Sequence, residues 1–490
     1  MRKLFTDPVS RLQFIAVIFF ATIYSLISLV NHYNFRTYAF DLGLHSSAMW
    51  DYAHFRFNNS TLMQPELNNY LSEHFELFTM VLSPFCYVFG TYTLLIFQIA
   101  FVIFGGFGVY RYIREISSDK MLPLLAQLHF YFFYGIFSAI YFDYHDNVLG
   151  AMFVPWFLYF FHTRKWKWAI LFFIFQVSTK ENMPLWMTFV CLGTALLYWQ
   201  DIKLRQTAFY FSAASFLFFI LVVKVIMPAL ANEGEAYFQI RSNYSVLGSS
   251  LTEIATTIFT RPLYILELLF TNQSGNALAD NYKIETYVFV LLSGGVLFFL
   301  RPQFILMLIP IFAQKMFHND FLKWGLGDHY SVEFAPICSI GAFYVIAKLK
   351  EEKLKKYLAW GTVVLSLAMT VRSFDRSYSY FDHARQRIYQ LAHYEKGYDV
   401  AEAHAALKLI PADAKVCAQS PFVPHLVFRD RVYQFPFVLD ADYIVISFDE
   451  TTYPATRDSF VAQTAVLMNS VEWERVYEKN KMLILKRKAI

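Results

Sequence analysis

The feature that most constrains this chain is the grouping of its apolar residues into long blocks. Each block runs for roughly 15 to 22 residues, which is the length that crosses the hydrocarbon core of a bilayer as a helix. Hydrophobic residues make up 57% of the chain and charged residues only 16%, whereas a soluble domain carries about 25% charge. The sequence therefore predicts a mainly α-helical bundle that crosses a membrane many times.

The blocks and the loops between them predict a topology. The first block follows Arg2, Lys3 and Arg11 without a small-residue cleavage site, so we expect an uncleaved first span rather than a signal peptide. Segment 76–90 reads as a partial or re-entrant helix, which leaves about eleven crossings of bilayer length. The crossing segments are expected at 12–31, 93–111, 121–141, 148–161, 167–180, 184–199, 207–229, 284–300, 303–317, 332–347 and 357–371.

Charge in the short loops predicts the orientation. Loops rich in lysine and arginine, such as 111–120, 164–167 and 348–356, all fall on the side of the N-terminus when the crossings alternate. By the positive-inside rule that side is cytoplasmic. We therefore expect a multi-pass membrane protein with its N-terminus in the cytoplasm and its C-terminus outside. The net charge of +4 follows from these loops and gives no reason to expect nucleic acid as a partner.

The chain divides into two predicted domains at about residue 372. Residues 1–372 form the membrane domain, with long outer loops at 32–75 and 230–283 that contain amphipathic stretches suited to lie at the interface. Residues 373–490 have a mixed polar composition typical of a small α/β domain outside the membrane. Strands are expected at 415–418, 443–448 and 482–485, and helices at 399–409 and 457–470.

Acidic residues and histidines cluster on the predicted outer side. Ionisable groups at membrane level are costly, so clusters at one depth suggest a common site. Asp41 follows the first span, and a partly desolvated carboxylate there is suited to accept a proton from a hydroxyl nucleophile. Asp41 is equally suited to cap a helix that starts at Leu42. His74 lies in a second cluster, whose acids also fit a helix start.

Three further pairs complete the candidate site. Asp143 and His145 end a very aromatic segment, and with His329 they are candidate ligands of a divalent metal ion; solvated loop residues are the alternative. Metal dependence stays open, because no segment has tight ligand spacing such as H-E-x-x-H. Lys180 and Glu181 interrupt two apolar helices, where a cation can hold a lipid-linked phosphate or form a plain ion pair. Asp328 and His329 lie in the last outer loop, where interfacial anchoring is the alternative.

A family resemblance is carried by short motifs. They are Phe40-Asp41-Leu42-Gly43-Leu44, Met49-Trp50, His74-Phe75, Asp143-Tyr144-His145, Lys180-Glu181-Asn182 and His329-Tyr330-Ser331. With them the chain resembles a bacterial and archaeal family of predicted membrane proteins of unknown function, which is grouped with the GT-C glycosyltransferases. The similarity extends nearly from end to end and includes Ile410-Pro411-Ala412-Asp413-Ala414.

The resemblance implies a GT-C-like fold and an enzyme that takes a sugar from a polyprenyl-phosphate carrier on the non-cytoplasmic face. Such enzymes have an essential acidic residue in the first outer loop, and Asp41 is the matching position here. The chain departs from the pattern after the Asp-aromatic-His motif, where it reads Asp146-Asn147, and it has no D-x-D in the first loop. The role of Asp146 is therefore less defined than that of His145.

The leading hypothesis is an inverting glycosyl transfer at the outer membrane boundary, with Asp41 as the base. Lys180, helped by Arg241 or a metal ion, would stabilise the departing polyprenyl phosphate. The sugar donor, membrane lipids and an acceptor lipid, glycan or protein would be the partners. The remaining residues expected to bind sugar, acceptor or metal are His74, Asp143, His145, Glu181, Asp328 and His329.

Two other classes of function remain open. A transporter or flippase of a lipid-linked or anionic substrate would place its charges near the bilayer midplane, on broken helices. A non-catalytic scaffold on the outer face would leave the clusters as unrelated caps and interface anchors. Convergence of the clusters on one cavity would favour the enzyme over the scaffold.

Overall fold

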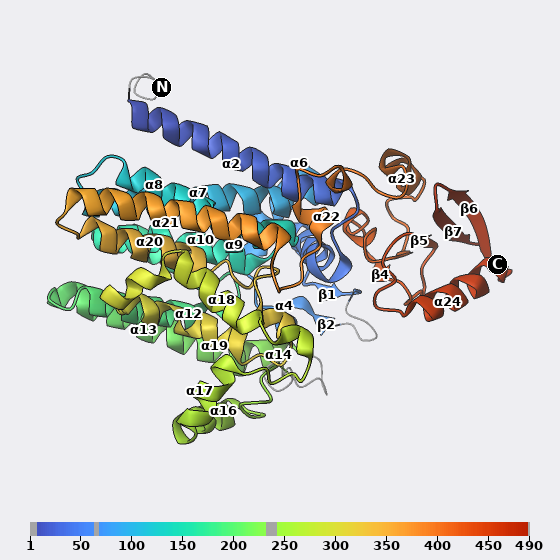
Figure 1. Cartoon of the computed structure of the whole chain (residues 1–490). Helices are drawn as coiled ribbons and strands as arrows, with labels where there is room; N and C mark the ends of the chain where they lie inside the picture. Colours follow the sequence, from blue (N-terminus) through green and yellow to red (C-terminus); the bar gives the residue numbers. More distant parts are fainter. Residues whose placement is uncertain (1–6, 63–67, 232–242, 489–490) are drawn as a thin grey trace.

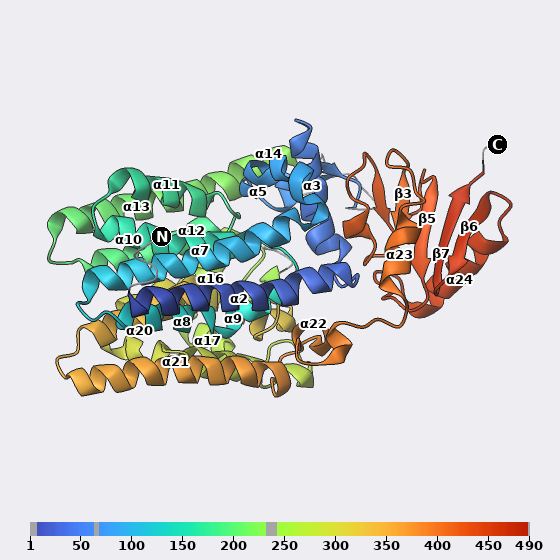
Figure 2. The ribbon, with the colours of Figure 1, turned by 90° about the horizontal axis from the view of Figure 1, so that it is seen from above.

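The chain forms a long helical bundle with a small sheet domain at one end. The computed structural model describes residues 7–62, 68–231 and 243–488. Figure 1 shows the helices side by side in the bundle and the C-terminal strands beyond its end. Seen from above in Figure 2, the helices α2 (Pro8–Tyr33), α7 (Thr93–Ile116) and α21 (Glu352–Asp375) run along the bundle.

The structure confirms a multi-pass helical membrane protein. Within the described residues, four stretches are long and apolar enough to cross a membrane, namely Pro8–Tyr33, Phe78–Ile116, Ile202–Leu230 and Glu352–Asp375. The bent pair α8 (Leu122–Tyr131) and α9 (Tyr134–Tyr141) makes a fifth if it is counted as one span. Shorter apolar helices accompany them, namely α11 (Trp166–Val177), α12 (Met183–Leu197), α19 (Gln303–Met316) and α20 (Phe334–Ala347). The count of about eleven crossings stays a prediction.

Two expected helices are broken by local backbone geometry. The segment expected at 284–300 divides into α18 (Tyr282–Leu292) and the 3-10 helix η6 (Gly295–Leu300). Gly294 lies between them with φ +98°, a conformation that side chains with a Cβ rarely adopt. The expected helix at 121–141 bends by 40° between α8 and α9.

Segment 76–90 consists of short helical pieces that lead into α7, and its expected re-entrant course stays a prediction. The pieces are α5 (Phe78–Leu82), η2 (Ser83–Phe85) and α6 (Cys86–Phe89), and η3 (Gly90–Tyr92) then leads into α7. Pro84 and the positive φ of Gly90, +58°, account for the change of helix type along the segment.

Close packing at the centre of the bundle depends on small residues. Helix α10 (Asp146–His162) packs against α7, where Gly105 and Gly108 face it. A Cβ added at Gly108 would lie 2.8 Å from the Cβ of Pro155, so only glycine permits this approach. Small residues at a helix interface are typical of packing inside membranes, where van der Waals contact drives association.

The amphipathic segments of the two outer loops are helical. In the first loop the helix is α3 (Leu44–Ala53); in the second they are α16 (Leu251–Thr260) and α17 (Pro262–Phe270), which are separated because Pro262 starts a new helix. Figure 1 shows α16 and α17 on the flank of the bundle. The other elements of the bundle and loops are η1 (Ala39–Gly43), β1 (Asn59–Ser60), β2 (Asn68–Asn69), α4 (Tyr70–Glu73), α13 (Ile202–Leu221), η4 (Val222–Ile226), α14 (Met227–Leu230), η5 (Ala277–Ala279) and η7 (Phe321–Trp324).

The C-terminal domain contains a five-stranded mixed sheet in the order β4-β3-β5-β7-β6. The strand β3 is parallel to β4 and β5, whereas β7 is antiparallel to β5 and β6. The three predicted strands and both predicted helices are present, but β4 and β6 were not predicted. The elements are α22 (His383–Gln386), η8 (Leu391–His393), α23 (Val400–Leu407), β3 (Val416–Ala418), η9 (Val423–His425), β4 (Val432–Gln434), β5 (Tyr443–Ser447), α24 (Arg457–Asn469), β6 (Trp473–Lys479) and β7 (Met482–Arg487).

The first outer loop and the sheet domain share one hydrophobic core. Phe35 and Ala39 of the loop are fully buried in the same cluster as Phe422 and Val423 of the domain. The ring centroids of Phe35 and Phe422 are 5.1 Å apart, and the backbone N–H of Ala39 donates to Ser420 Oγ at 3.1 Å. The sheet domain is therefore fixed over the loop that carries Asp41.

Candidate functional site

Asp41 lies on the π-helix η1, directly under the sheet domain. Its side chain is 25% exposed, and its Oδ1 lies 3.7 Å from Nε2 of His145. Burial raises the pKa of the Asp41 carboxyl, although nearby Arg385 and His45 oppose this effect. Asp41 does not cap α3, whose N-cap residue is Gly43. It is a partly exposed carboxylate beside a buried imidazole.

Two stacked imidazoles line this position. The rings of His145 and His329 are 3.6 Å apart and nearly parallel, and both residues are 5% exposed. The Phe142 ring contacts both imidazoles, with centroid distances of 5.4 Å to His145 and 5.8 Å to His329. Among the described residues, His145 Nε2 and His329 Nδ1 have no hydrogen-bond partner. These nitrogens can bind a group that enters the site.

Asp143 has a structural role at the edge of the site. It adopts a positive φ of +83°. Its carboxylate accepts a hydrogen bond from the backbone N–H of Tyr38 at 2.9 Å and one from Arg385 Nη2 at 2.7 Å. The Asp143 side chain is fully buried in this ion pair. The pair ties the first outer loop and the end of α9 to α22, and it leaves Asp143 poorly placed to bind a metal ion.

Glu76, which was not among the predicted site residues, lies at the centre of a second group. Lys180 Nζ donates to Glu76 Oε1 at 3.0 Å, and His45 Nε2 lies 3.0 Å from Glu76 Oε2. Tyr70 also donates its hydroxyl to Oε2. Glu76 has no exposed side-chain surface. The fold thus brings α3, α4, the start of α5 and the α11–α12 turn to one carboxylate.

Asp146 completes this group from the start of α10. Its carboxylate accepts hydrogen bonds from Tyr144 at 2.8 Å and from Thr79 at 2.9 Å. His45, Glu76 and Asp146 each offer one ligand atom, and these atoms lie within 4.8 Å of one another. In the part of the chain that the structure describes, no other set of three such residues comes this close. The predicted metal candidates Asp143, His145 and His329 do not form such a set.

Lys180 and Glu181 lie near each other but have separate partners. The Lys180 ammonium is paired with Glu76. Glu181 Oε1 lies 3.6 Å from His74 Nδ1, and its Oε2 accepts the backbone N–H of Phe75 at 3.2 Å. The two predicted residues Glu181 and His74 are therefore brought together, and Lys180 is already neutralised in this structure.

The last outer loop contributes a second lysine. Lys323 donates to the hydroxyl of Tyr330, and its Nζ lies 3.8 Å from the centre of that ring. No described carboxylate forms an ion pair with Lys323. Asp328 has a positive φ of +58°, and burial raises its pKa to about 6. Since the Tyr330 ring contacts the tilted ring of His329, with centroids 4.0 Å apart, Lys323 lies near the imidazole pair.

Arg241, the remaining predicted site residue, lies outside the described residues. Two residues that sequence reasoning missed, Glu76 and Arg385, are held by partners 104 and 242 positions away. Glu76 belongs to the predicted outer cluster around His74, but its carboxylate was interpreted as one of the acids of a helix start and not as a site residue. Nothing in the sequence around Arg385 distinguishes it from other arginines of the C-terminal region.

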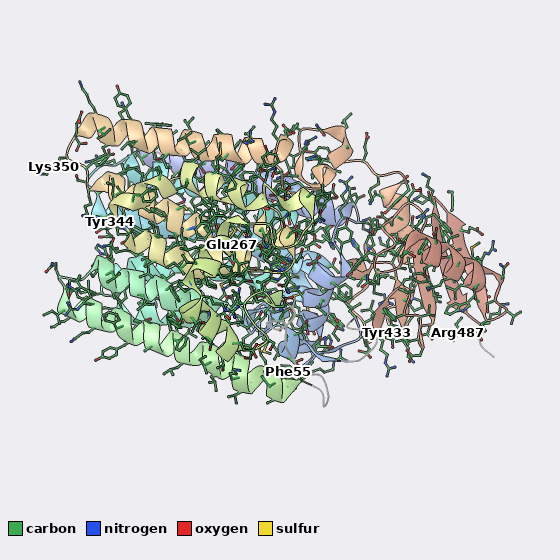
Figure 3. The ribbon with its side chains drawn as sticks, turned by 60° about the horizontal axis from the view of Figure 1, so that its bottom comes forward. Phe55, Glu267, Tyr344, Lys350, Tyr433 and Arg487 are labelled. Atoms are coloured by element: carbon green, nitrogen blue, oxygen red, sulfur yellow. The ribbon has the colours of Figure 1, made fainter. Side chains whose placement is uncertain are left out.

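The site and the basic loops lie at different ends of the bundle. Figure 3 labels Lys350, in the loop between α20 and α21, at one end, and Tyr433 and Arg487 in the sheet domain beyond the other end. Asp41 and His45 belong to the first outer loop, which packs against the sheet domain (Figure 1). This separation agrees with the charge pattern of the loops, which is the basis of the expected orientation.

A multi-pass membrane bundle with a sheet domain packed over a buried, charged site defines the class of this protein. The chain belongs to the family described as predicted membrane proteins, DUF2079, whose match covers residues 31–484. The match includes Asp41, the group of His45, Glu76, Asp146 and Lys180, and the sheet domain up to the start of β7. No curated protein matches the chain.

Proposed function

We propose that this protein is an inverting glycosyltransferase that takes a sugar from a polyprenyl-phosphate carrier at the extracytoplasmic face of a bacterial inner membrane. The observation that supports the proposal is the position of Asp41, a partly exposed carboxylate 3.7 Å from the buried imidazole of His145. A carboxylate in this setting is suited to remove a proton from a hydroxyl. The GT-C relationship, the eleven crossings and the outward orientation form part of the proposal.

In the proposed reaction, the acceptor hydroxyl attacks the anomeric carbon of the sugar while Asp41 takes the hydroxyl proton. The bond between the anomeric carbon and the phosphate oxygen breaks, and its electron pair leaves with the polyprenyl phosphate. Configuration inverts because attack and departure occur on opposite faces. The charge that develops on the phosphate needs a nearby cation. Lys323 suits this role better than Lys180, since Lys180 is paired with Glu76.

The proposal assigns the other predicted residues roles in binding the substrate or in supporting the site. His145 and His329 offer unpartnered ring nitrogens to sugar or acceptor hydroxyls. Asp328 precedes His329 in sequence, and Glu181, which pairs with His74, follows Lys180. Asp143 supports the site through Arg385 and is not expected to touch the substrate.

The alternative is a transporter or flippase of a lipid-linked substrate. Such a protein would need ionisable groups along its path near the bilayer midplane. The candidate residues instead lie in segments between the long helices, and Asp41 lies in the loop that packs against the sheet domain. This arrangement favours chemistry at the membrane boundary over transport through the bundle.

The test is sugar transfer in proteoliposomes from a panel of radiolabelled polyprenyl-phosphate sugars, comparing wild type with Asp41→Asn. Loss of a general base lowers the rate by about 10²- to 10⁴-fold, so we expect product from wild type and almost none from the variant. Asp458→Asn, an acid-to-amide change at an exposed position of α24, is the matched control and should keep full activity. Equal activity in wild type and Asp41→Asn would remove Asp41 from the mechanism. Donor translocation without product would favour the transporter.

A further inference from the structure

The group of His45, Glu76 and Asp146 has the composition and spacing of a metal centre. Their ligand atoms lie within 4.8 Å of one another, and the three side chains come from α3, the loop before α5 and the start of α10. Metal–ligand bonds of about 2.0–2.2 Å to histidine and carboxylate place neighbouring ligand atoms roughly 3–4 Å apart. Small side-chain adjustments therefore suffice to close the group around one ion.

The tautomer of His45 is fixed in the way that metal-binding histidines require. His45 Nδ1 lies 2.7 Å from the backbone carbonyl oxygen of Asp41, and because a carbonyl can only accept, Nδ1 carries the proton. In the neutral ring, Nε2 then presents a lone pair to Glu76 Oε2, 3.0 Å away. Two electron-rich atoms at this distance require a cation or a proton between them. A backbone carbonyl that orients the remote ring nitrogen is the usual second-shell support of a histidine ligand.

The two carboxylates are oriented by hydrogen bonds from their outer sides. Tyr144 and Thr79 donate to Asp146, and Tyr70 and Lys180 donate to Glu76. Metal-ligating carboxylates commonly have such donors, which hold the oxygen atoms in place. Both carboxylates are in residues with no exposed surface, so water cannot solvate their charge.

The group of His45, Glu76 and Asp146 has more negative than positive charge around it, which favours a bound cation. Glu76 and Asp146 are buried side by side, and Lys180 is the only described lysine or arginine that forms an ion pair with either. Two carboxylates and one ammonium leave one uncompensated negative charge in the group, which favours the binding of a cation.

We propose that His45, Glu76 and Asp146 bind one divalent transition-metal ion. Imidazole nitrogen suits zinc and the later transition metals, whereas carboxylates suit manganese and magnesium, so the mixed set fits Mn²⁺ or Zn²⁺ best. The ion would lie one hydrogen bond from the Asp41 backbone, where it would fix the loop that carries the proposed base. The site stands on its own geometry and does not depend on the identity of the transferred group.

The test measures metal binding directly in purified, full-length protein in nanodiscs. After chelator treatment, the protein is titrated with Mn²⁺ and with Zn²⁺, and bound metal is counted by elemental analysis. We expect one ion per chain for wild type and an affinity lowered by at least about 100-fold in Asp146→Asn, beyond the range seen for outer-shell partners. Electron spin-echo spectroscopy of Mn²⁺ bound to wild type should show the signal of a coordinated imidazole nitrogen. This signal should be absent from His45→Gln.

His74→Ala is the matched control, because His74 contacts a partly exposed carboxylate, Glu181, without a third ligand. It should bind metal as wild type does. Size-exclusion elution and the unfolding midpoint without metal show whether each variant is folded, and Asp146→Glu should restore binding in part. Equal affinity in wild type and Asp146→Asn, or no imidazole signal, overturns the proposal. Since no sugar transfer is measured, failure here is separate from failure of the proposed reaction.

Discussion

The Asp143–Arg385 ion pair shows how single residues hold distant parts of this chain together. The two residues are 242 positions apart, and both side chains are almost completely buried. Arg385 also lies over the rings of Tyr38 and Tyr141, with distances of 5.2 and 5.4 Å to the ring centres. A buried charge without its partner is strongly unfavourable, so the two residues depend on each other.

We expect Arg385→Met to lower the free energy of unfolding by about 3–5 kcal/mol, because it leaves the Asp143 carboxylate buried and uncompensated. The double variant Asp143→Asn/Arg385→Met should recover part of this loss, since no charge is then left alone. Denaturant unfolding of the solubilised protein measures both. Arg475→Met removes an exposed pair with Glu478 and should change stability by less than about 1 kcal/mol. Similar losses in Arg385→Met and Arg475→Met would contradict this account.

At the residue scale, the sequence predicted which types of residue form the site but not which side chains contact each other. Asp41 and His145 were predicted site residues and do lie together. Lys180 was expected to be available for phosphate, yet Glu76 neutralises it. Pairing of this kind depends on segments more than a hundred positions apart, and a single sequence carries no signal for it.

At the scale of helices and strands, the sequence predicted where elements lie but not every break between them, as Gly294 shows. Apolar blocks predicted where helices lie, because burial in lipid or in the bundle requires them. They did not predict the break between α18 and η6, which depends on one backbone angle. The strands β4 and β6 were missed for a related reason: β4 has three residues, and β6 is largely exposed at the sheet edge with a charged sequence.

Replacing Gly294 by alanine should destabilise the protein by about 1–3 kcal/mol, since the new Cβ meets a positive φ. That Cβ would also lie 2.9 Å from the Cβ of Ala342 on α20. Thermal unfolding of the two proteins in the same detergent gives the difference. Gly361→Ala on α21 is the control: its Cβ would meet no atom within 4 Å, so stability should be unchanged or slightly higher. An unchanged midpoint for Gly294→Ala would show that the break does not depend on glycine.

For the whole molecule, the predicted division into a membrane bundle and a C-terminal sheet agrees with the observed elements, whereas the common core was not predicted. Composition distinguishes lipid-facing from water-facing segments and so reveals the change near residue 372. The contact between the first outer loop and the sheet domain depends on matching shapes, such as Phe35 against Phe422, which composition does not encode.

An odd number of crossings predicts that Lys350 and Val471 lie on opposite sides of the membrane. The four native cysteines are buried, so single cysteines placed at these two exposed positions report accessibility. In intact cells whose outer membrane has been permeabilised, a membrane-impermeant maleimide should label Val471→Cys. Lys350→Cys should react only after the inner membrane is opened. Labelling of both from the same side would exclude about eleven crossings with this orientation.

The core shared by the first outer loop and the sheet domain also sets an order of events during biosynthesis. Ala39 emerges from the ribosome 381 residues before Ser420, to which it is hydrogen-bonded. Ribosomes synthesise a chain at about 5–20 residues per second. The loop that carries Asp41 therefore waits tens of seconds before the sheet domain that packs against it has been synthesised. The Asp41 loop is completed only when the last strands have been translated and folded. A nascent or truncated chain would therefore carry every residue of the membrane part of the site and still be unable to hold the loop in its working shape.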